Sequence, residues 1–119
     1  MHPEKIFEDS DILVVNKPAG LIVNSSVTAK GVTLQDLVSE DLVISESDED
    51  SEFAKRGGVV HRLDKDTSGV MLIAKNREAF ESLQSQFKSR EVHKIYFAHV
   101  LGLVKEEIGE IDAPIMRHP

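Results

Sequence analysis

The chain of 119 residues contains no cysteine and no tryptophan, and it has a single tyrosine. Without cysteine it can form no disulfide framework, no thiolate metal site and no cysteine nucleophile. No apolar run approaches the roughly 20 residues of a membrane-spanning helix, and the N-terminus lacks the basic and then apolar pattern of a signal peptide. We therefore expect a cytoplasmic protein of one domain with a modest core and no membrane partner.

Basic residues are scarce relative to acidic ones, and the net charge is −7. This excess of acid disfavours nucleic-acid binding, because phosphate contacts need lysine and arginine. The charge is uneven, however. Residues 1–52 hold 3 basic and 12 acidic residues, whereas residues 53–119 hold 11 basic and 9 acidic ones. The second part of the chain therefore remains compatible with a polyanionic partner.

Much of the acid lies in residues 45–52, whose sequence is SESDEDSE. A low-complexity acidic run without apolar anchors is typical of a solvated, mobile loop. Two other interpretations stay open, namely a metal site and a surface that recruits a basic partner. The run lacks the central glycine and the terminal glutamate of a calcium-binding loop, which counts against the first of them.

The most informative segment is HRLDKDTSG at residues 61–69, which two short apolar runs flank at 59–60 and 70–74. The apolar runs predict buried strands. Arg62 and Asp64 are separated by Leu63, so in an extended backbone they point the same way and Leu63 points opposite. The hydroxyls and glycine that follow favour a tight return of the chain. The segment can hold a carboxylate at a cleft, or it can be a polar loop with a surface ion pair.

The remaining pattern predicts an α+β protein with a mixed, mainly antiparallel sheet and packed helices. Thr33 and Asn76 are candidate N-caps for two amphipathic helices. The expected helices span residues 33–44 and 77–89, and further strands are expected at residues 5–8, 12–15, 21–23, 91–101 and 108–111.

Three motifs together carry a family resemblance. The run HRLDKDTSG resembles the HRLDxxTSG signature of the RluA-type pseudouridine synthases. The segment VVNKPAG at residues 14–20 is similar to an N-terminal element of that family, and Lys94 and Tyr96 match its Lys-x-Tyr motif. The family usually has His-Pro after the N-terminal element, where this chain has Asn24 and Ser25. The resemblance implies part of the pseudouridine synthase catalytic fold.

The resemblance also implies a chemistry, the isomerisation of uridine to pseudouridine in structured ribosomal or transfer RNA. This reaction needs a carboxylate, a pocket for the detached base and no cofactor or metal. Asp64 would be the catalytic carboxylate, Tyr96 a wall that stacks on the base, and Arg62 a side chain that fills the vacated space. His61 and Thr67 would contact the RNA. Lys17 is either a solvated turn lysine or a phosphate contact.

The resemblance covers residues 1–119 but only about the first half of a family catalytic domain. In that family a later motif supplies a basic residue that pairs with the catalytic aspartate. We therefore expect a partial catalytic domain with an uncovered sheet edge or apolar face that favours self-association. Besides an active isomerase, two alternatives remain: an inactive RNA-binding or self-associating remnant, and a structural domain whose acidic run binds a basic partner.

Overall fold

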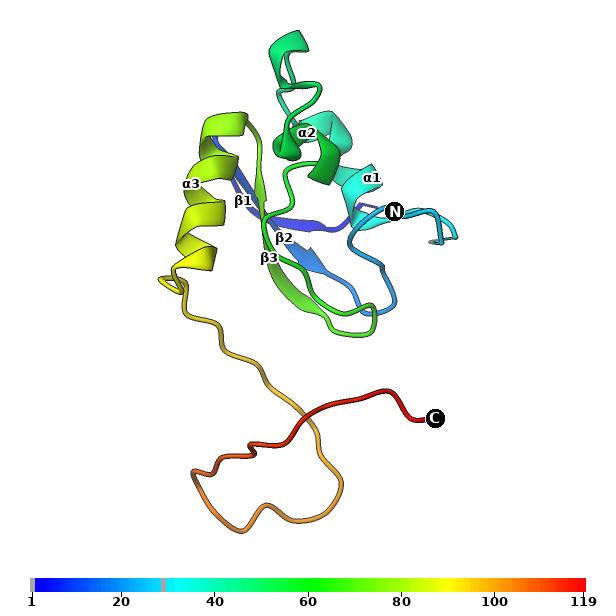
Figure 1. Ribbon diagram of the computed structural model, residues 1–119, viewed down its shortest axis with the longest axis vertical. Coiled ribbons are helices and arrows are strands. Elements are labelled where there is room, and N and C mark those ends of the chain that lie inside the picture. The colour runs from blue at the N-terminus through cyan, green and yellow to red at the C-terminus, as the bar shows by residue number, and fades with distance from the viewer. Residues whose placement is uncertain (1, 29) are drawn as a thin grey trace.

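The computed structural model describes residues 2–28 and 30–119, and it shows one sheet with helices packed on it (Figure 1). No helix within this part of the chain combines the length and the apolar character that crossing a bilayer requires. The elements in chain order are β1 (Glu4–Glu8), β2 (Ile12–Lys17), α1 (Leu34–Val38), α2 (Glu52–Arg56), β3 (Gly69–Ala74) and α3 (Arg77–Lys88), with short 3-10 helices at Ser39–Asp41 and Glu46–Asp48.

The three strands form an antiparallel sheet in the order β1-β2-β3, which confirms the predicted fold class. Leu13 pairs with Ile73 across β2 and β3, and Val15 pairs with Met71. All four side chains are fully buried, because alternate residues of a strand point to one face of the sheet. The core on this face is completed by Val23, Leu34, Val38, Val59 and Leu63.

Helix α3 packs beside β3 and confirms the helix predicted after Asn76. The Asn76 side chain accepts a hydrogen bond from the backbone N–H of Ala79 at 2.9 Å and so satisfies one of the free donors of the first turn. Phe80 is buried against Phe53 of α2, with ring centroids 5.9 Å apart. The apolar face predicted from the helical spacing therefore forms a second small core.

The helix expected at residues 33–44 is shorter in the structure. Thr33 is its N-cap, as predicted, but α1 ends at Val38 and a 3-10 turn follows. The strand expected at residues 21–23 is not formed. The carbonyls of Ile22 and Val23 instead accept the N–H groups of Leu34 and Gln35, so this segment caps the helix.

The acidic run contains a short 3-10 turn at Glu46–Asp48, and most of its side chains are exposed, as expected of a solvated loop; its mobility stays a prediction. The Asp48 carboxylate is buried and accepts hydrogen bonds from the Ser45 backbone N–H at 3.1 Å and from its hydroxyl at 2.8 Å. These bonds lower the pKa of Asp48, the backbone bond most of all. Phe53 lies just after the run and is buried. Local hydrogen bonds and this one apolar neighbour hold the turn at Asp48.

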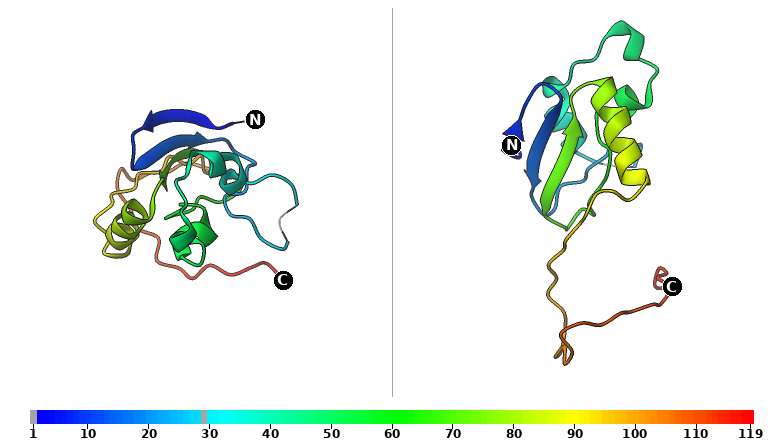
Figure 2. Two further views of the ribbon diagram at one scale, coloured as in Figure 1. Left: turned by 90° about the horizontal axis from the view of Figure 1, so that it is seen from above. Right: turned by 90° about the vertical axis from the view of Figure 1, so that its left-hand side faces the viewer.

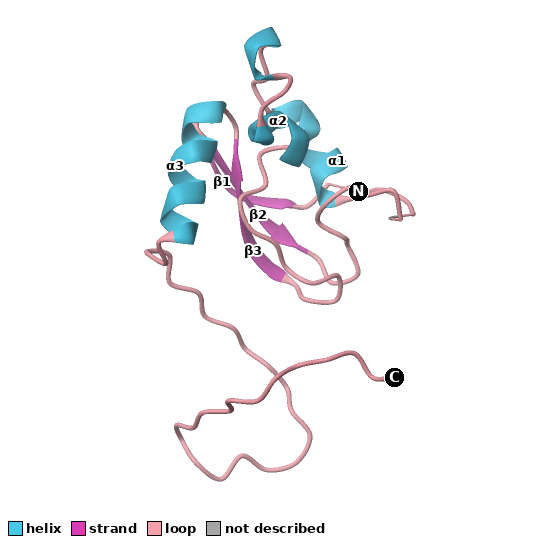
Figure 3. Cartoon of the chain, in the orientation of Figure 1, coloured by secondary structure: helices cyan, strands magenta, loops and turns pink. Residues whose placement is uncertain are grey.

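The chain after α3 runs away from the sheet as an extended segment, residues 90–119 (Figures 2 and 3). The strands predicted at 91–101 and 108–111 are not formed there. Apolar side chains of this segment, such as Ile95 and Leu101, are almost fully exposed as a result. A strand needs a neighbouring strand to pair with its N–H and C=O groups, and this segment pairs with none of the three strands. Accordingly the radius of gyration is 16.5 Å, against about 13.5 Å for a compact chain of this length.

Candidate active site

The HRLDKDTSG segment is a loop that connects residues 58–60, which lie alongside β3, to the first residue of β3, Gly69. Before the segment, Val59 bridges Ile73, so the strand predicted at 59–60 is reduced to a single bridge. Leu63 is buried, whereas Arg62 and Asp64 are exposed, as the alternation of the sequence predicts. An anchored leucine therefore presents both charged side chains to the solvent.

Asp64 begins a tight turn in which its carbonyl accepts the backbone N–H of Thr67 at 3.0 Å. Among residues 2–28 and 30–119, no side chain forms an ion pair or a hydrogen bond with the Asp64 carboxylate. Asp64 and Arg62 therefore do not form the surface ion pair that was the alternative interpretation of this loop. The backbone around the carboxylate is fixed, and the carboxylate itself is available to a ligand.

Lys17 is fully buried, so the interpretation as a solvated turn lysine is wrong. Its ammonium donates to the carbonyls of Pro18 at 3.0 Å, Leu21 at 2.7 Å and Lys65 at 2.9 Å. An ammonium has three donors, so none is left for an RNA phosphate. The predicted phosphate contact is therefore not available to Lys17 in this arrangement.

The contacts of Lys17 join two motifs that lie far apart in the sequence. The carbonyl of Lys65, the residue after Asp64, accepts both the Lys17 ammonium and the backbone N–H of Gly20, the latter at 2.7 Å. Burial lowers the pKa of Lys17, and the negative charge of Asp66 opposes that shift. The turn after β2 thus holds the loop that carries Asp64.

His61 is fixed from two sides. Its Nε2 accepts the backbone N–H of Leu72 at 3.0 Å, and its ring stacks on Phe87 of α3 at a centroid distance of 4.5 Å and an angle of 16°. Burial lowers the pKa of His61, and the positive charge of Lys94 lowers it further. The imidazole is therefore held as the neutral form at neutral pH.

A cavity of about 560 Å³ brings three of the predicted site residues together, namely His61, Thr67 and Tyr96. It lies among the loop, β3, the end of α3 and residues 92–97, and its volume is in the range of small-molecule sites. Arg62 and Asp64 belong to the same loop but are not in its lining, and Lys17 lies in the interior. Tyr96 is 62 % exposed, so its ring is open to the solvent at the mouth of the cavity.

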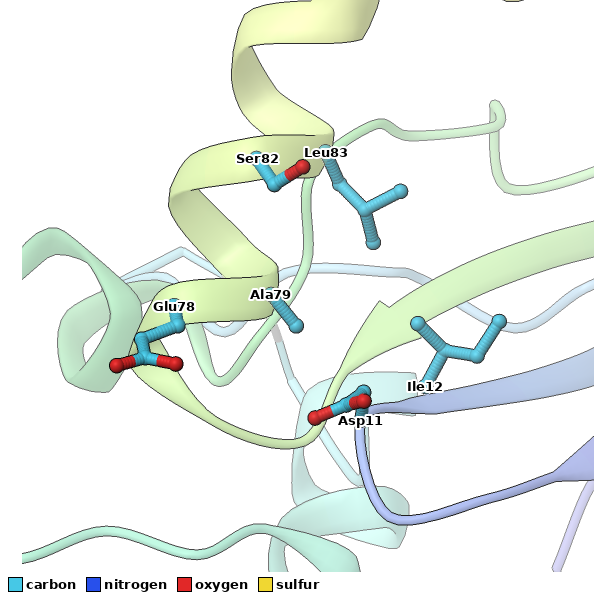
Figure 4. Close-up of a pocket in the computed structure, with 6 residues that line it drawn as sticks. All are labelled: Asp11, Ile12, Glu78, Ala79, Ser82 and Leu83. Carbon is cyan, nitrogen blue, oxygen red and sulfur yellow. The ribbon is translucent and has the colours of Figure 1, made fainter.

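A second hollow of about 340 Å³ lies between the first turns of α3 and the start of β2 (Figure 4). It contains none of the predicted site residues; its lining is Asp11, Ile12, Glu78, Ala79, Ser82 and Leu83. Within the described ranges, no three histidine or acidic side chains are grouped as a metal site would require. Neither the acidic run nor this hollow has the ligand set for a cation.

Sequence reasoning missed three contributors to the site: the Phe87 ring, the Leu72 backbone N–H and the Lys65 carbonyl. The spacing of Phe87 predicts only that it lies on the apolar face of a helix. Backbone groups carry no residue signature, so no sequence pattern could have indicated the other two.

Comparison with known proteins places these motifs in one family. Residues 11–118 match the family described as RNA pseudouridylate synthase. An uncharacterized RNA pseudouridine synthase of Aquifex aeolicus is 47 % identical over 96 % of this chain and 35 % of its own length. The ribosomal large subunit pseudouridine synthase D of Pseudomonas aeruginosa is 42 % identical over 97 % of this chain and 34 % of its own length.

A third relative is the dual-specificity RNA pseudouridine synthase RluA of Vibrio parahaemolyticus, 44 % identical over 93 % of this chain and 40 % of its own length. The chain thus spans about a third of the length of the curated relatives it matches. Human RNA pseudouridylate synthase domain containing 4 has a similar fold, with a TM-score of 0.51 and 23 % identity over 74 % of this chain and 30 % of that one. The sequence matches and the three motifs agree, and the chain belongs to the RluA-type RNA pseudouridine synthase family.

Proposed function

We propose that this chain carries the catalytic loop of an enzyme that isomerises uridine to pseudouridine in RNA, with Asp64 as the catalytic carboxylate. The observation that supports this most is the presentation of Asp64. Its backbone is pinned by the turn to Thr67 and by the bonds at Lys65, while its carboxylate is exposed and unpaired among the described residues. A rigid backbone beneath a free carboxylate is what a positioned catalytic group requires.

The reaction breaks the N1–C1′ bond of uridine and forms a C5–C1′ bond. The C5 proton is lost, and N1 gains a proton. Asp64 acts beside C1′ and C6 as nucleophile or charge stabiliser. The target nucleotide must leave its stack, and the exposed Tyr96 ring gives the extruded base a surface on which to stack. Arg62, exposed beside Asp64, fills the space that the nucleotide vacates.

The substrate we propose is structured RNA, and ribosomal RNA first of all. One relative is named as a ribosomal large subunit enzyme and another as a dual-specificity enzyme. The chain carries 11 basic against 9 acidic residues from position 53 onwards, so the part with the loop and Tyr96 does not repel phosphate as the first 52 residues do. Such a substrate would place the protein in the cytoplasm.

A second proposal concerns the extended segment, residues 90–119. We propose that residues 1–119 form part of a catalytic domain and that this segment packs against another protein surface. When the chain is studied alone, that surface belongs to a second copy of the chain. Its apolar side chains are exposed, Ile95 at 97 % and Leu101 at 105 % of the reference area. Exposed apolar residues of strand-like spacing favour association. Sedimentation velocity should show concentration-dependent dimers, and a monomer at high concentration would contradict this proposal.

The test of the main proposal is release of tritium from uridine labelled at C5 in unmodified ribosomal and transfer RNA transcripts. Asp64→Asn should reduce release to background, because the amide cannot act as the carboxylate does. Asp66→Asn is the matched control: it removes an exposed acid from the same loop and should retain release. Filter binding of the RNA at low salt shows whether each variant still binds. Equal release by the wild-type and Asp64→Asn proteins would refute the catalytic role of Asp64.

A further inference from the structure

The bond between His61 and Leu72 stands where a backbone hydrogen bond would be expected. Residues 58–60 run antiparallel to β3: Val59 bridges Ile73, and the Ala74 N–H donates to the Gly58 carbonyl at 2.9 Å. In this register, the next acceptor for the Leu72 N–H is the carbonyl of Val60. The structure gives that N–H to the His61 imidazole instead, at 3.0 Å.

This substitution of a side chain for a carbonyl lets the backbone leave the sheet. The Leu72 N–H therefore keeps an acceptor when the chain turns away after Val60, and the cost of leaving this donor unpaired is avoided. Leu63 can then enter the core while Asp64 faces outward. The stacked Phe87 ring holds the imidazole in plane from the side of α3.

The bond also fixes the protonation state of His61. A backbone N–H only donates, so Nε2 must be the unprotonated nitrogen and the proton must lie on Nδ1. The other titratable groups that line the cavity are His93, Lys94 and Tyr96, all on residues 92–97. The lining residues from α3 and β3 carry no titratable side chain. An imidazolium would lose the acceptor and would face the Lys94 ammonium.

We propose that neutral His61 is a positioning residue for Asp64. Its Nε2 accepts the Leu72 N–H in place of the Val60 carbonyl, so the pairing with β3 stops at this point and the loop that carries Asp64 begins. It acts through the loop rather than by contact with RNA. Protonation of His61 releases the Leu72 N–H and loosens the loop. The link to catalysis rests on the proposed function, whereas the tether itself does not.

Two variants separate the acceptor from the ring. His61→Gln places an amide oxygen at the same number of bonds from Cα as Nε2, so it keeps an acceptor that does not titrate. His61→Phe keeps the stacking on Phe87 and removes the acceptor. By NMR, wild-type His61 should show the Nδ1–H tautomer at neutral pH. The Leu72 amide should exchange about tenfold faster in the Phe variant than in wild type, and the Gln variant should remain close to wild type.

A pH titration of the wild-type chain gives the same test without a variant. The Leu72 amide should lose protection as His61 becomes protonated, and the Asp64 amide resonance should move with the same midpoint. The proposal is overturned if His61 is the Nε2–H tautomer, or if Leu72 exchange is unchanged both in His61→Phe and on protonation of His61.

Tritium release tests the link to catalysis. It should fall in His61→Phe and be retained in His61→Gln, and the Gln variant should lack the wild-type decline at acid pH. A wild-type chain that binds RNA but releases no tritium would refute the proposed function, while the NMR data would still decide the tether. Equal release by the Phe and Gln variants, with the tether confirmed, would refute the positioning of Asp64.

Discussion

Replacing Lys17 by methionine tests whether the buried ammonium holds the catalytic loop. Methionine keeps an unbranched side chain of similar length and removes the charge and all three donors. The carbonyls of Pro18 and Leu21 then lose the ammonium, while the Lys65 carbonyl keeps the Gly20 N–H. The change therefore leaves buried acceptors without opening a large cavity.

The magnitude follows from two opposing terms. A hydrogen bond to a charged group contributes about 1.5–3 kcal/mol, and Lys17 makes three of them. Burying the ammonium costs several kcal/mol, and that cost disappears with the charge. We expect a net loss of about 2–4 kcal/mol in the free energy of unfolding. For a chain of 119 residues this lowers the melting temperature by about 8–16 °C.

Urea unfolding followed by circular dichroism measures this change. Lys65→Met is the matched control, because that side chain is exposed on the same loop and its loss should cost less than about 0.5 kcal/mol. At temperatures where the Lys17→Met protein is folded, the Asp64 amide resonance should still differ from wild type, since the loop has lost one of its anchors. A Lys17→Met protein as stable as the control would refute the structural role of the ammonium.

Three further predictions concern stability and pH. Gly58→Ala should destabilise the protein by more than about 2 kcal/mol, because a Cβ there would overlap the Ala74 carbonyl oxygen; Gly20→Ala, also at positive φ but in open space, should cost only about 1–2 kcal/mol in the same urea titration. Asn76→Ala removes the N-cap of α3 and should cost at least about 1 kcal/mol, which thermal unfolding measures; Asn76→Asp keeps the capping oxygen but sets a carboxylate against that of Asp11, which accepts the Asn76 amide at 2.8 Å, so it should restore only part of the stability. The pKa of His61 is lowered in the folded state, so the unfolded chain binds more protons below about pH 6.5. The free energy of unfolding should therefore fall as the pH is lowered from 6.5 through the folded pKa, and His61→Gln should remove that part of the pH dependence.

Local rules of sequence were sufficient for much of this protein. The apolar runs of β2 and β3, the helical spacing of Phe80, Leu83 and Phe87, and the capping residue Asn76 determined three elements near their observed bounds. The alternation of side chains along an extended backbone determined that Leu63 is buried while its neighbours Arg62 and Asp64 are exposed. These features depend on residues that are close together in the sequence, so the sequence alone is enough to predict them.

The tertiary structure decided whatever depends on a distant partner. Apolar alternation in residues 91–101 predicts a strand, but no adjacent strand meets it, and the segment stays extended and exposed. The sequence around Lys17 is compatible with a surface turn residue. Its burial depends on the hydrogen bond from its ammonium to the carbonyl of Lys65, which lies 48 positions away in the sequence. The role of His61 likewise depends on a backbone N–H of β3 and a ring of α3. A buried polar side chain is defined by its acceptors and donors, and only the folded chain brings those together.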